Sequence, residues 1–509
     1  MKDSRKVYFL ILVAALGYFV DIYDLVLFGV VKAESLAQII PDATDEARAA
    51  TGKFLFNVQM FGMLLGGILW GILGDKKGRI KVLFGSILLY SIANIANAFV
   101  TDITSYTFIR LLAGIGLAGE LGAGITLISE LMNKETRGYG TMLVVTFGAL
   151  GAVVASLIGA EGHAVGHFIA GLSGWQPANW QVVYIIGGLM GLVLLLLRVG
   201  ALESGFFEKI NHDPKIQKGN LKIIFANRAN LIKYLHCISI GIPIWYTVGL
   251  LVMNSADNFG PWLGVYDISN GKAVMYCYLG LSAGDLLAGV LSQWLRSRKK
   301  VVYLYLAFTL LCTVLFLIVL HTYNISSDTY YLLCFLLGTG TGYWAIFVTI
   351  AAEQFGTNIR STAANTIPNF VRGSVNIIML LFGTLLAMGI SDGWSALLVG
   401  LFFIGLAASL GIAELGVYQR IKVAILSSGD ELCDMSEPLV PGKIYDSNRF
   451  SLHACLSRLG FEIIDCGIVR DTPEDLRHAF TLASQKADVI IIDTAGRLAV
   501  DEQMMKEIA

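Results

Sequence analysis

Four ionisable residues fall inside long apolar stretches of the sequence. Asp21 and Asp24 occur in GYFVDIYDLVLF, Arg110 begins RLLAGIGLAG, and Arg372 ends NTIPNFVR. An ionisable side chain in a hydrocarbon environment is rare unless it is functional or paired. A carboxyl group beside a guanidinium can titrate as its surroundings change, so these residues could carry a proton.

The candidate proton-coupling set is Asp21, Asp24, Arg110 and Glu120. Asp21 and Asp24 are three residues apart, which favours one face of a helix. At a rise of about 1.5 Å per residue, Asp24 lies roughly 10 Å from the outer end of its helix and Arg110 roughly 8 Å from the outer end of its own. These depths agree. The alternative is a permanent buried ion pair that holds the two helices together.

Arg372 is the candidate for binding an anion. It lies about nine residues, or roughly 14 Å, from the expected cytoplasmic end of its helix. A guanidinium that faces a cavity is a natural partner for a carboxylate or phosphate, although Arg372 could instead pair with Asp285 or Glu120. Other candidate cavity residues are polar or aromatic, and the aromatic ones are more often packing residues: Asn365, Asn369, Trp245, Tyr246, Asn254, Tyr343, Trp344 and Asp285.

Membrane-spanning helices must position these residues. The chain has 509 residues, of which 55% are hydrophobic and 15% charged, and its mean hydropathy is +0.67; soluble domains carry roughly 25% charged residues. The first 416 positions hold twelve apolar segments of about 20 residues, the length that crosses a bilayer. We therefore expect an all-α membrane protein of twelve helices embedded in lipid.

Lysine and arginine alternate between the connections of these segments. Basic clusters follow the second and eighth segments, at 76–81 and 296–300, whereas the connections near 101–105, 161–179 and 391–394 contain neither residue. By the positive-inside rule, both ends of the membrane region face the cytoplasm.

A polar stretch divides the twelve segments into two sets of six. We expect a first half at 1–200, a cytoplasmic linker at 201–230 and a second half at 231–416. This layout is typical of transporters whose halves rock around a central site. The repeat is visible where GILGDKKGRIK (71–81) corresponds to GVLSQWLRSRKK (289–300), which keeps the glycine and the basic cluster and loses the aspartate.

The motif GILGDKKGRIK resembles the signature between helices 2 and 3 of the major facilitator superfamily. Glycine permits the tight cytoplasmic turn and close helix approach, and an aspartate is favourable near a helix N-terminus. The resemblance is carried by Gly71, Asp75, Lys76, Gly78, Arg79 and Lys81.

The segments RLLAGIGLAGELGAGITLISELMNKETRG and AAEQFGTNIR resemble the sugar and metabolite proton symporters of that superfamily. The resemblance implies proton-coupled symport of a small organic metabolite by alternating access in the bacterial inner membrane, with Asp24 paired to Arg110. It also implies cytoplasmic ion pairs that lock the halves; individually such exposed pairs are worth about 0–1 kcal/mol. Their residues are Glu130, Arg137, Glu203, Glu353 and Arg360.

The seventh segment, GIPIWYTVGLLVMN, lacks the paired glutamines that sugar porters use for hydroxyl groups. This disfavours a neutral hexose and, with Arg372, favours an anionic substrate. We expect a functional monomer that binds no nucleic acid and needs no cofactor.

Residues 417–509 form a cytoplasmic tail of different composition, with the pattern strand, helix, strand, helix, strand of a short α/β fragment. Residues 417–492 resemble the molybdopterin molybdotransferase family, in which Glu431 and Asp471 match positions around the molybdate and the pterin phosphate. From about 488, DVIIIDTAGRL resembles the signal recognition particle GTPase family. The two resemblances meet within ADVII, as at a recombination or assembly junction.

The tail is not expected to be an enzyme. No P-loop pattern, G-x-x-x-x-G-K-[ST], occurs in the chain to hold a nucleotide's phosphates. The glycine-rich loop of the molybdotransferases is also absent after DVII. The alternative function is a membrane-anchored enzyme that binds molybdopterin or a nucleotide through this tail.

Overall fold

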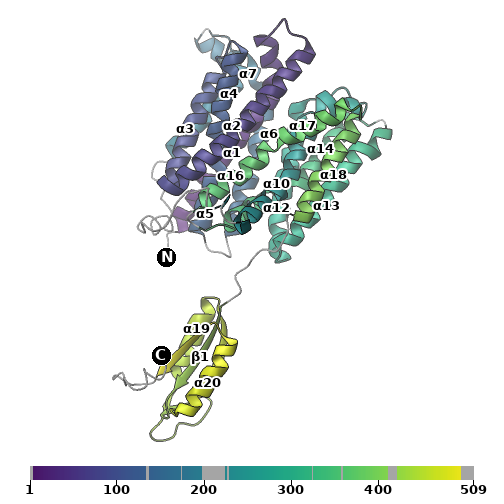
Figure 1. The fold of residues 1–509 in the computed structure, drawn as a ribbon. Helices are drawn as coiled ribbons and strands as arrows, with labels where there is room; N and C mark the ends of the chain where they lie inside the picture. Colours follow the sequence, from purple (N-terminus) through teal and green to yellow (C-terminus); the bar gives the residue numbers. More distant parts are fainter. Residues whose placement is uncertain are drawn as a thin grey trace. The chain divides into compact units, whose positions relative to one another are not determined.

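The computed structural model describes residues 4–132, 137–173, 175–197, 224–225, 228–323, 325–356, 359–410 and 421–494. The chain divides into two compact units, Met1–Ala413 and Glu414–Ala509. Each unit is treated separately below (Figure 1).

The first half of the membrane unit is a bundle of helices, purple to blue in Figure 1. Its helices are α1 (Ser4–Ile39), α2 (Asp45–Lys77), α3 (Arg79–Asn97), α4 (Ile103–Leu117), α5 (Glu120–Leu131), α6 (Arg137–Ser173) and α7 (Asn179–Leu197).

The second half is a similar bundle, teal to green in Figure 1. Its α-helices are α10 (Arg228–Trp245), α11 (Gly260–Trp262), α12 (Asn270–Trp294), α13 (Arg298–Val314), α14 (Ser327–Thr341), α15 (Trp344–Glu353), α16 (Arg360–Gly373), α17 (Val375–Ala387) and α18 (Asp392–Leu410). Three π-helical segments and one 3-10 turn lie between them: η1 (Tyr246–Val252), η2 (Ser255–Phe259), η3 (Leu315–Val319) and η4 (Leu320–Thr322).

Eleven helical segments in the described residues are long and apolar enough to cross a membrane. The remaining apolar helix, Lys81–Asn97 within α3, is shorter. It lies where the sequence predicts the third span. The expected all-α membrane fold is therefore confirmed, although the count of twelve full-length spans is not reached by this measure.

Two expected spans are interrupted at equivalent places in the halves. The fourth is split into α4 and α5 around Gly119, and the tenth into α14 and α15 around Gly342. At Gly342 an added Cβ would lie 2.4 Å from the Cα of Gly284, so the interruption lies at a close crossing with α12. Broken helices are tolerated at membrane depth where they are buried in protein or line a cavity.

The two halves meet along a few helix pairs. α2 packs along α16, α6 packs along α12, and α5 contacts both α15 and α16. Any movement of one half against the other must therefore rearrange these crossings.

The tail unit is a three-layer α/β fragment. Its sheet holds β1 (Lys422–Ser428) between β4 (Glu462–Val469) and β5 (Val489–Thr494), all parallel, in the order β4-β1-β5. The helices α19 (Ser447–Arg458) and α20 (Pro473–Lys486) connect them, and β2 (Leu432–Cys433) pairs with β3 (Ile444–Tyr445). The predicted strand and helix pattern is confirmed, with this small pair as an addition.

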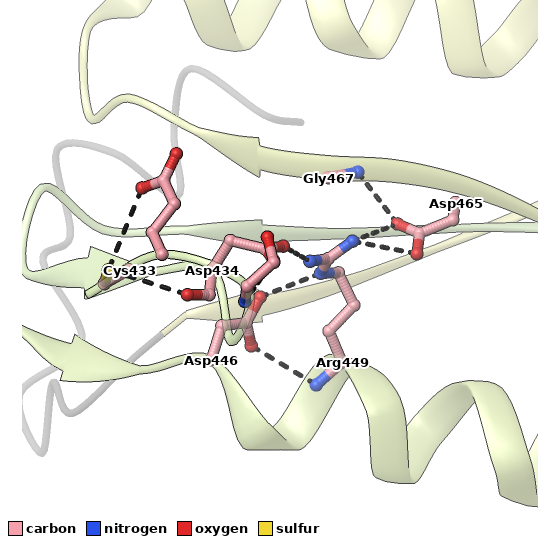
Figure 2. Close-up of polar contacts among 8 residues, drawn as sticks. Cys433, Asp434, Asp446, Arg449, Asp465 and Gly467 are labelled. Atoms are coloured by element: carbon pink, nitrogen blue, oxygen red, sulfur yellow. Dashed lines mark hydrogen bonds and ion pairs between the residues drawn. The ribbon is translucent and has the colours of Figure 1, made fainter. Parts of the chain in front are cut away.

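Arg449 of α19 holds the tail together through three carboxylates (Figure 2). It donates to both oxygens of Asp465 at 2.8 Å, to Asp446 at 2.9 Å and to Asp434 at 2.6 Å. Burial alone would lower the pKa of the guanidinium, but the hydrogen bonds and charges of Asp465 and Asp446 outweigh it and raise the pKa. Arg449 therefore stays charged and is a structural residue.

We predict that Arg449→Met destabilises the tail, because it leaves the buried Asp446 without a counter-charge. Removing one partner of a buried network costs on the order of 3 kcal/mol. Limited proteolysis of the full chain should show faster cleavage within 421–494, while the exposed Arg458→Met on the same helix should not. Equal protease resistance of the two variants would contradict this assignment.

The pKa of Asp434 is lowered by hydrogen bonds from Ser436, then by Arg449. Its contribution to stability is thus complete above the ordinary value of 3.8 and is lost as the pH falls through the lowered pKa.

Candidate functional site

A cavity at the centre of the membrane unit lies between the two halves. Its walls come from α1 and α6 of the first half and from α10, η1, α12, α15 and α16 of the second. Its free volume is about 20 Å³, room for about one water molecule, so the cavity would have to widen to admit a substrate. The lining is aliphatic apart from a set of aromatic rings and one guanidinium: Tyr18, Trp245, Tyr278, Trp344 and Arg372. Such a lining can hold a flat apolar group and a negative charge together.

Arg372 of α16 and Asp21 of α1 form an ion pair between the halves. Nη2 of Arg372 donates to Oδ2 of Asp21 at 3.2 Å, and both side chains are at most 1% exposed. The guanidinium also lies 5.8 Å from the ring of Trp344. Within the described part of the chain, Nε of Arg372 and Oδ1 of Asp21 make no hydrogen bond. The guanidinium thus keeps a spare donor beside the cavity.

This ion pair differs from the sequence-based expectation. From the sequence, the expected partner of Arg372 is a substrate anion, Asp285 or Glu120, and Asp21 belongs with Arg110 in the proton-coupling set. The structure instead pairs Asp21, from the proton-coupling set, with Arg372, the candidate anion-binding residue. The fold brings these residues together although they are 351 positions apart in the chain. Asp21 is consequently both a carboxyl group in the apolar interior and the partner of the candidate anion-binding residue.

Asp24 and Arg110 are buried but do not form the expected ion pair in this structure. Nη1 of Arg110 donates to the hydroxyl of Tyr184 at 3.3 Å, and its guanidinium lies 4.4 Å from the centre of the Phe28 ring. The Asp24 carboxylate is directed at α7, where an added Cβ on Gly187 would lie 2.4 Å from it. Neither oxygen of Asp24 accepts a hydrogen bond from the described residues.

Asp21 and Asp24 also face different neighbours. A spacing of three residues turns the second side chain by about 300°, so the two carboxylates diverge by about 60°. One meets α16 of the other half, and the second meets α7 of its own half. The expectation that they share one face is therefore only approximate.

Glu120 and Asp285 both lie at helix N-termini created by the interruptions. Glu120 is the first residue of α5, and its Oε1 accepts from Oγ of Ser86 at 2.9 Å. Asp285 of α12 accepts from the backbone N–H of Ala345 at 2.9 Å, at the start of α15. A carboxylate is stabilised there by the exposed N–H groups and the helix dipole. Neither residue pairs with Arg372 by a contact recorded here.

The other candidate cavity residues separate into two groups. Trp245 and Trp344 line the cavity. The hydroxyls of Tyr246 and Tyr343 instead donate to backbone carbonyls of Ala396 and Ile240, each at 2.8 Å. Asn254 donates to the carbonyl of Leu250 at 2.8 Å and lines a second, outer cavity.

Asn365 and Asn369 lie on the seam between α16 and the first half, on the side of the cavity that the positive-inside rule predicts to face the cytoplasm. The amide of Asn369 donates to the carbonyl of Ala118 at 2.9 Å, within the interruption between α4 and α5. That of Asn365 donates to the carbonyl of Ser361 at 2.9 Å. Only Asn369 approaches the site, because its Oδ1 accepts from Arg372 at 3.5 Å. Neither asparagine lines the cavity in this structure, and the bond from Asn365 stays within α16. Their role in substrate binding stays a prediction.

The seam between α2 and α16 requires glycine. A Cβ added to Gly67 would lie 2.9 Å from Cβ of Asn369, and one added to Gly71 would lie 2.9 Å from Cα of Thr362. A Cβ added to Gly74 would lie 2.1 Å from Oγ of Ser361. Real Cβ atoms essentially never approach that closely. These residues form a tight closure on the side predicted to face the cytoplasm.

Asp75 completes this closure at the N-terminus of α16. Its carboxylate accepts from the backbone N–H groups of Ser361 at 3.0 Å and Thr362 at 2.9 Å, and from the Thr362 hydroxyl at 2.6 Å. A negative charge placed on free N–H groups is favourable. Gly78 follows with a φ of 100°, a conformation that glycine adopts without strain, and separates α2 from α3.

The remaining gating candidates are only partly visible. Glu353 of α15 forms a bidentate ion pair with Arg298 of α13, inside the second half. Arg360 begins α16. The side chains of Arg79, Glu130 and Arg137, and the whole of Glu203, lie outside the described residues, so their gating roles stay predictions.

Sequence reasoning missed Tyr18 and Tyr278, which line the cavity, and Ser361 and Thr362, which bind Asp75. Tyr18 is three residues from Asp21, a spacing that favours a shared helix face. No comparable signal marks the others, because their partners are distant in the chain.

Two halves of membrane helices around a central cavity define a secondary transporter of the repeated-half type. The family model "Major Facilitator Superfamily" matches residues 14–377, and the chain belongs to that superfamily.

Relatives are similar over most of the membrane unit. The putative niacin/nicotinamide transporter NiaP of Bacillus subtilis (strain 168) is 29% identical over 345 residues, covering 67% of this chain and 80% of the relative. The 3-(3-hydroxy-phenyl)propionate transporter of Escherichia coli (strain K12) is 28% identical, covering 66% and 78%. The structure of the proton:xylose symporter XylE bound to 6-bromo-6-deoxy-D-glucose aligns with a TM-score of 0.58 at 17% identity, covering 80% of this chain and 95% of that one. It shows the fold alone.

The tail matches a different family. The model "Probable molybdopterin binding domain" covers residues 424–496. A molybdopterin molybdenumtransferase of Haemophilus influenzae is 44% identical over 97 residues, which is 19% of this chain and about a quarter (24%) of that relative. The resemblance of the last residues to the signal recognition particle GTPase stays a prediction.

We predict that Gly71→Leu prevents closure of the cytoplasmic seam, because the side chain would meet the backbone of Thr362. In a protein that also carries Asn365→Cys, the cysteine should react with a thiol reagent at least ten times faster when Gly71→Leu is present. Gly383→Leu is the matched control, since nothing lies within 4 Å of an added Cβ there. The protein without Asn365→Cys gives the background of the native thiols. An unchanged rate would show that the seam tolerates a side chain.

Proposed function

We propose that the chain is a proton-coupled symporter that carries a small aromatic carboxylate inward across the bacterial inner membrane by alternating access. The observation that carries this proposal is the buried ion pair between Arg372 and Asp21, which joins the two halves beside a cavity lined with aromatic rings. The names of the relatives support an aromatic substrate. Niacin and 3-(3-hydroxy-phenyl)propionate are aromatic carboxylic acids, and nicotinamide, also named for the first relative, is a neutral aromatic amide.

The proposed cycle exchanges one carboxylate for another on Arg372. While Asp21 is ionised, it occupies the guanidinium and holds α1 against α16. A proton taken up by Asp21 removes this charge and frees Arg372 for the carboxylate of the substrate. The guanidinium thus always has one anionic partner, which avoids the cost of an unpaired buried charge. Loss of the substrate to the cytoplasm and of the proton from Asp21 restores the pair.

The aromatic rings would hold the apolar part of the same substrate. Trp344 lies beside the guanidinium, so a ring carrying a carboxylate can stack on an aromatic surface while its charge meets Arg372. The same lining offers few hydrogen-bonding groups for a sugar. Asp24 and Arg110 remain further candidates for the proton, in a separate polar pocket of the first half.

We predict saturable uptake of nicotinate, benzoate or 3-(3-hydroxyphenyl)propionate into proteoliposomes. An inward proton gradient should drive accumulation. Arg372→Gln should lower uptake at least a hundredfold, because the anion loses its partner. Asp21→Asn should abolish gradient-driven accumulation but retain counterflow exchange, because its amide cannot titrate while Arg372 stays available.

Asp24→Asn tests the alternative proton site in the same assay, and the elution profile of each detergent-solubilised variant checks its folding. Transport of neutral sugars, or of none of the three acids, would reject the substrate class. Full accumulation by both aspartate variants would reject proton coupling through either residue.

We also predict that a chain ending at Gly416 transports as the full chain does. Every residue of the central site belongs to the membrane unit. The initial uptake rate per folded molecule should change less than twofold. Loss of uptake by a well-folded truncated chain would assign the tail a part in transport.

The second candidate function is binding of a pterin or a nucleotide by the tail. The 44% identity to the molybdenumtransferase favours a pterin, and Asp430, Glu431 and Asp471 follow the carboxyl ends of neighbouring parallel strands. The fit is poor, because carboxylates repel a phosphate and Arg449 is occupied by three aspartates. The described residues also contain no group of acidic, histidine or cysteine side chains arranged for a metal ion. Binding of molybdopterin or a Mg²⁺·GTP analogue to the full chain would support this function.

A further inference from the structure

A second cavity lies between the halves on the outer side of the central one. Its walls come from α1 and α2 of the first half and from η1 and α17 of the second. Its free volume is about 30 Å³, so a ligand larger than water would have to part these walls. Two aromatic rings, Phe28 and Phe56, face it together with two lysines, Lys32 and Lys53. We call it the outer cavity.

The outer cavity carries more positive than negative charge. Nζ of Lys32 forms an ion pair with Oδ2 of Asp257, in η2 of the other half, at 3.1 Å. Lys53 has no ion pair or hydrogen bond with any described residue. Two ammonium groups therefore line the cavity, and the carboxylate of Asp257 pairs with only one of them. This leaves a place for a second anion.

The ion pair between Lys32 and Asp257 can be displaced. The two side chains are 19% and 31% exposed, and an ion pair in contact with water is worth only about 0–1 kcal/mol. The buried pair of Arg372 and Asp21 is shielded from such competition. A carboxylate arriving from outside would therefore compete at Lys32 before it meets Arg372.

The two cavities follow one another along the same elements. On α1, Ile22 lines the central cavity and Phe28 lines the outer one. On η1, Val248 lines the central cavity and the next residue, Gly249, lines the outer one. Six residues of α-helix correspond to about 9 Å. A substrate in the outer cavity thus lies about one aromatic acid's length from the central site.

We propose that the outer cavity is an entry site for the aromatic carboxylate, separate from the site at Arg372. The carboxylate binds Lys53 and displaces Asp257 from Lys32, while its ring lies against Phe28 and Phe56. Binding in this manner opens the contact between α1 and η2. The substrate class rests on the proposed function, whereas the anion selectivity of the cavity does not.

Thiol chemistry tests the cavity without transport. Gly29 lines it and has nothing within 4 Å of an added Cβ, so Gly29→Cys fits. We measure the rates at which this cysteine reacts with the anionic reagent methanethiosulfonate ethylsulfonate and with its cationic trimethylammonium counterpart, both added from outside. The ratio of anionic to cationic rate should fall at least fivefold with Lys53→Gln. It should stay unchanged with Lys272→Gln, an exposed lysine of α12 that does not line the cavity.

Benzoate should slow the reaction with the anionic reagent, and neutral benzamide should not. In uptake assays, Lys53→Gln should raise the KM for external benzoate at least fivefold with little change in maximal rate, and Asp257→Asn should lower it. A rate ratio that does not depend on Lys53, together with equal effects of benzoate and benzamide, would overturn the proposal.

The outcomes separate the two proposals. Anion selectivity that depends on Lys53, without uptake of any aromatic acid, would reject the proposed function and keep the entry site for another anion. Uptake of the acids that is insensitive to Lys53 would reject the entry site alone.

Discussion

The ion pair between Asp21 and Arg372 constrains how the two halves of the membrane unit can move. Neither charge can lose its partner inside the apolar interior without a cost of several kcal/mol, and the partners belong to different halves. The halves are therefore tied together at the site itself. A transporter built this way cannot separate its halves at the centre until a proton or another anion neutralises one partner. Substrate chemistry and the movement of the halves then become one event.

The two sides of the site are closed by different kinds of contact. On the side predicted to face the cytoplasm, glycines of α2 let α16 approach to backbone contact, and Asp75 holds the N-terminus of α16. On the opposite side, Lys32 and Asp257 form a partly exposed ion pair between the halves. Close packing depends strongly on shape, whereas a hydrated ion pair yields to competing ions. The glycine seam is therefore expected to open less readily than the contact at Lys32.

The sequence predicts the features that depend on local pattern. Long apolar segments and the alternation of basic connections predict the membrane fold, and the motif GILGDKKGRIK indicates the superfamily. The strand and helix pattern predicts the α/β tail. The contacts of the site could not be predicted in the same way. The pairing of Asp21 with Arg372 depends on residues 351 positions apart. Asp24 and Arg110 form no direct ion pair in this structure, because side-chain direction depends on neighbouring helices. The interruptions that place Glu120 and Asp285 at helix ends arise at crossings with other helices, which one segment does not reveal.

The π-helix η1 has a further consequence, since it forms a wall of both cavities. A π-helix bonds each N–H five residues back, so it holds an extra residue compared with an α-helix of the same length. If η1 tightened to α-helical geometry, the residues that follow it would rotate about the helix axis by about 100°, the angle that one residue of an α-helix subtends. Asp257 lies only five residues beyond η1 and would swing away from Lys32, while Trp245 before it stayed in place. A change from π-helical to α-helical geometry in η1, beside the central cavity, would then rotate the residues that follow it at the outer cavity.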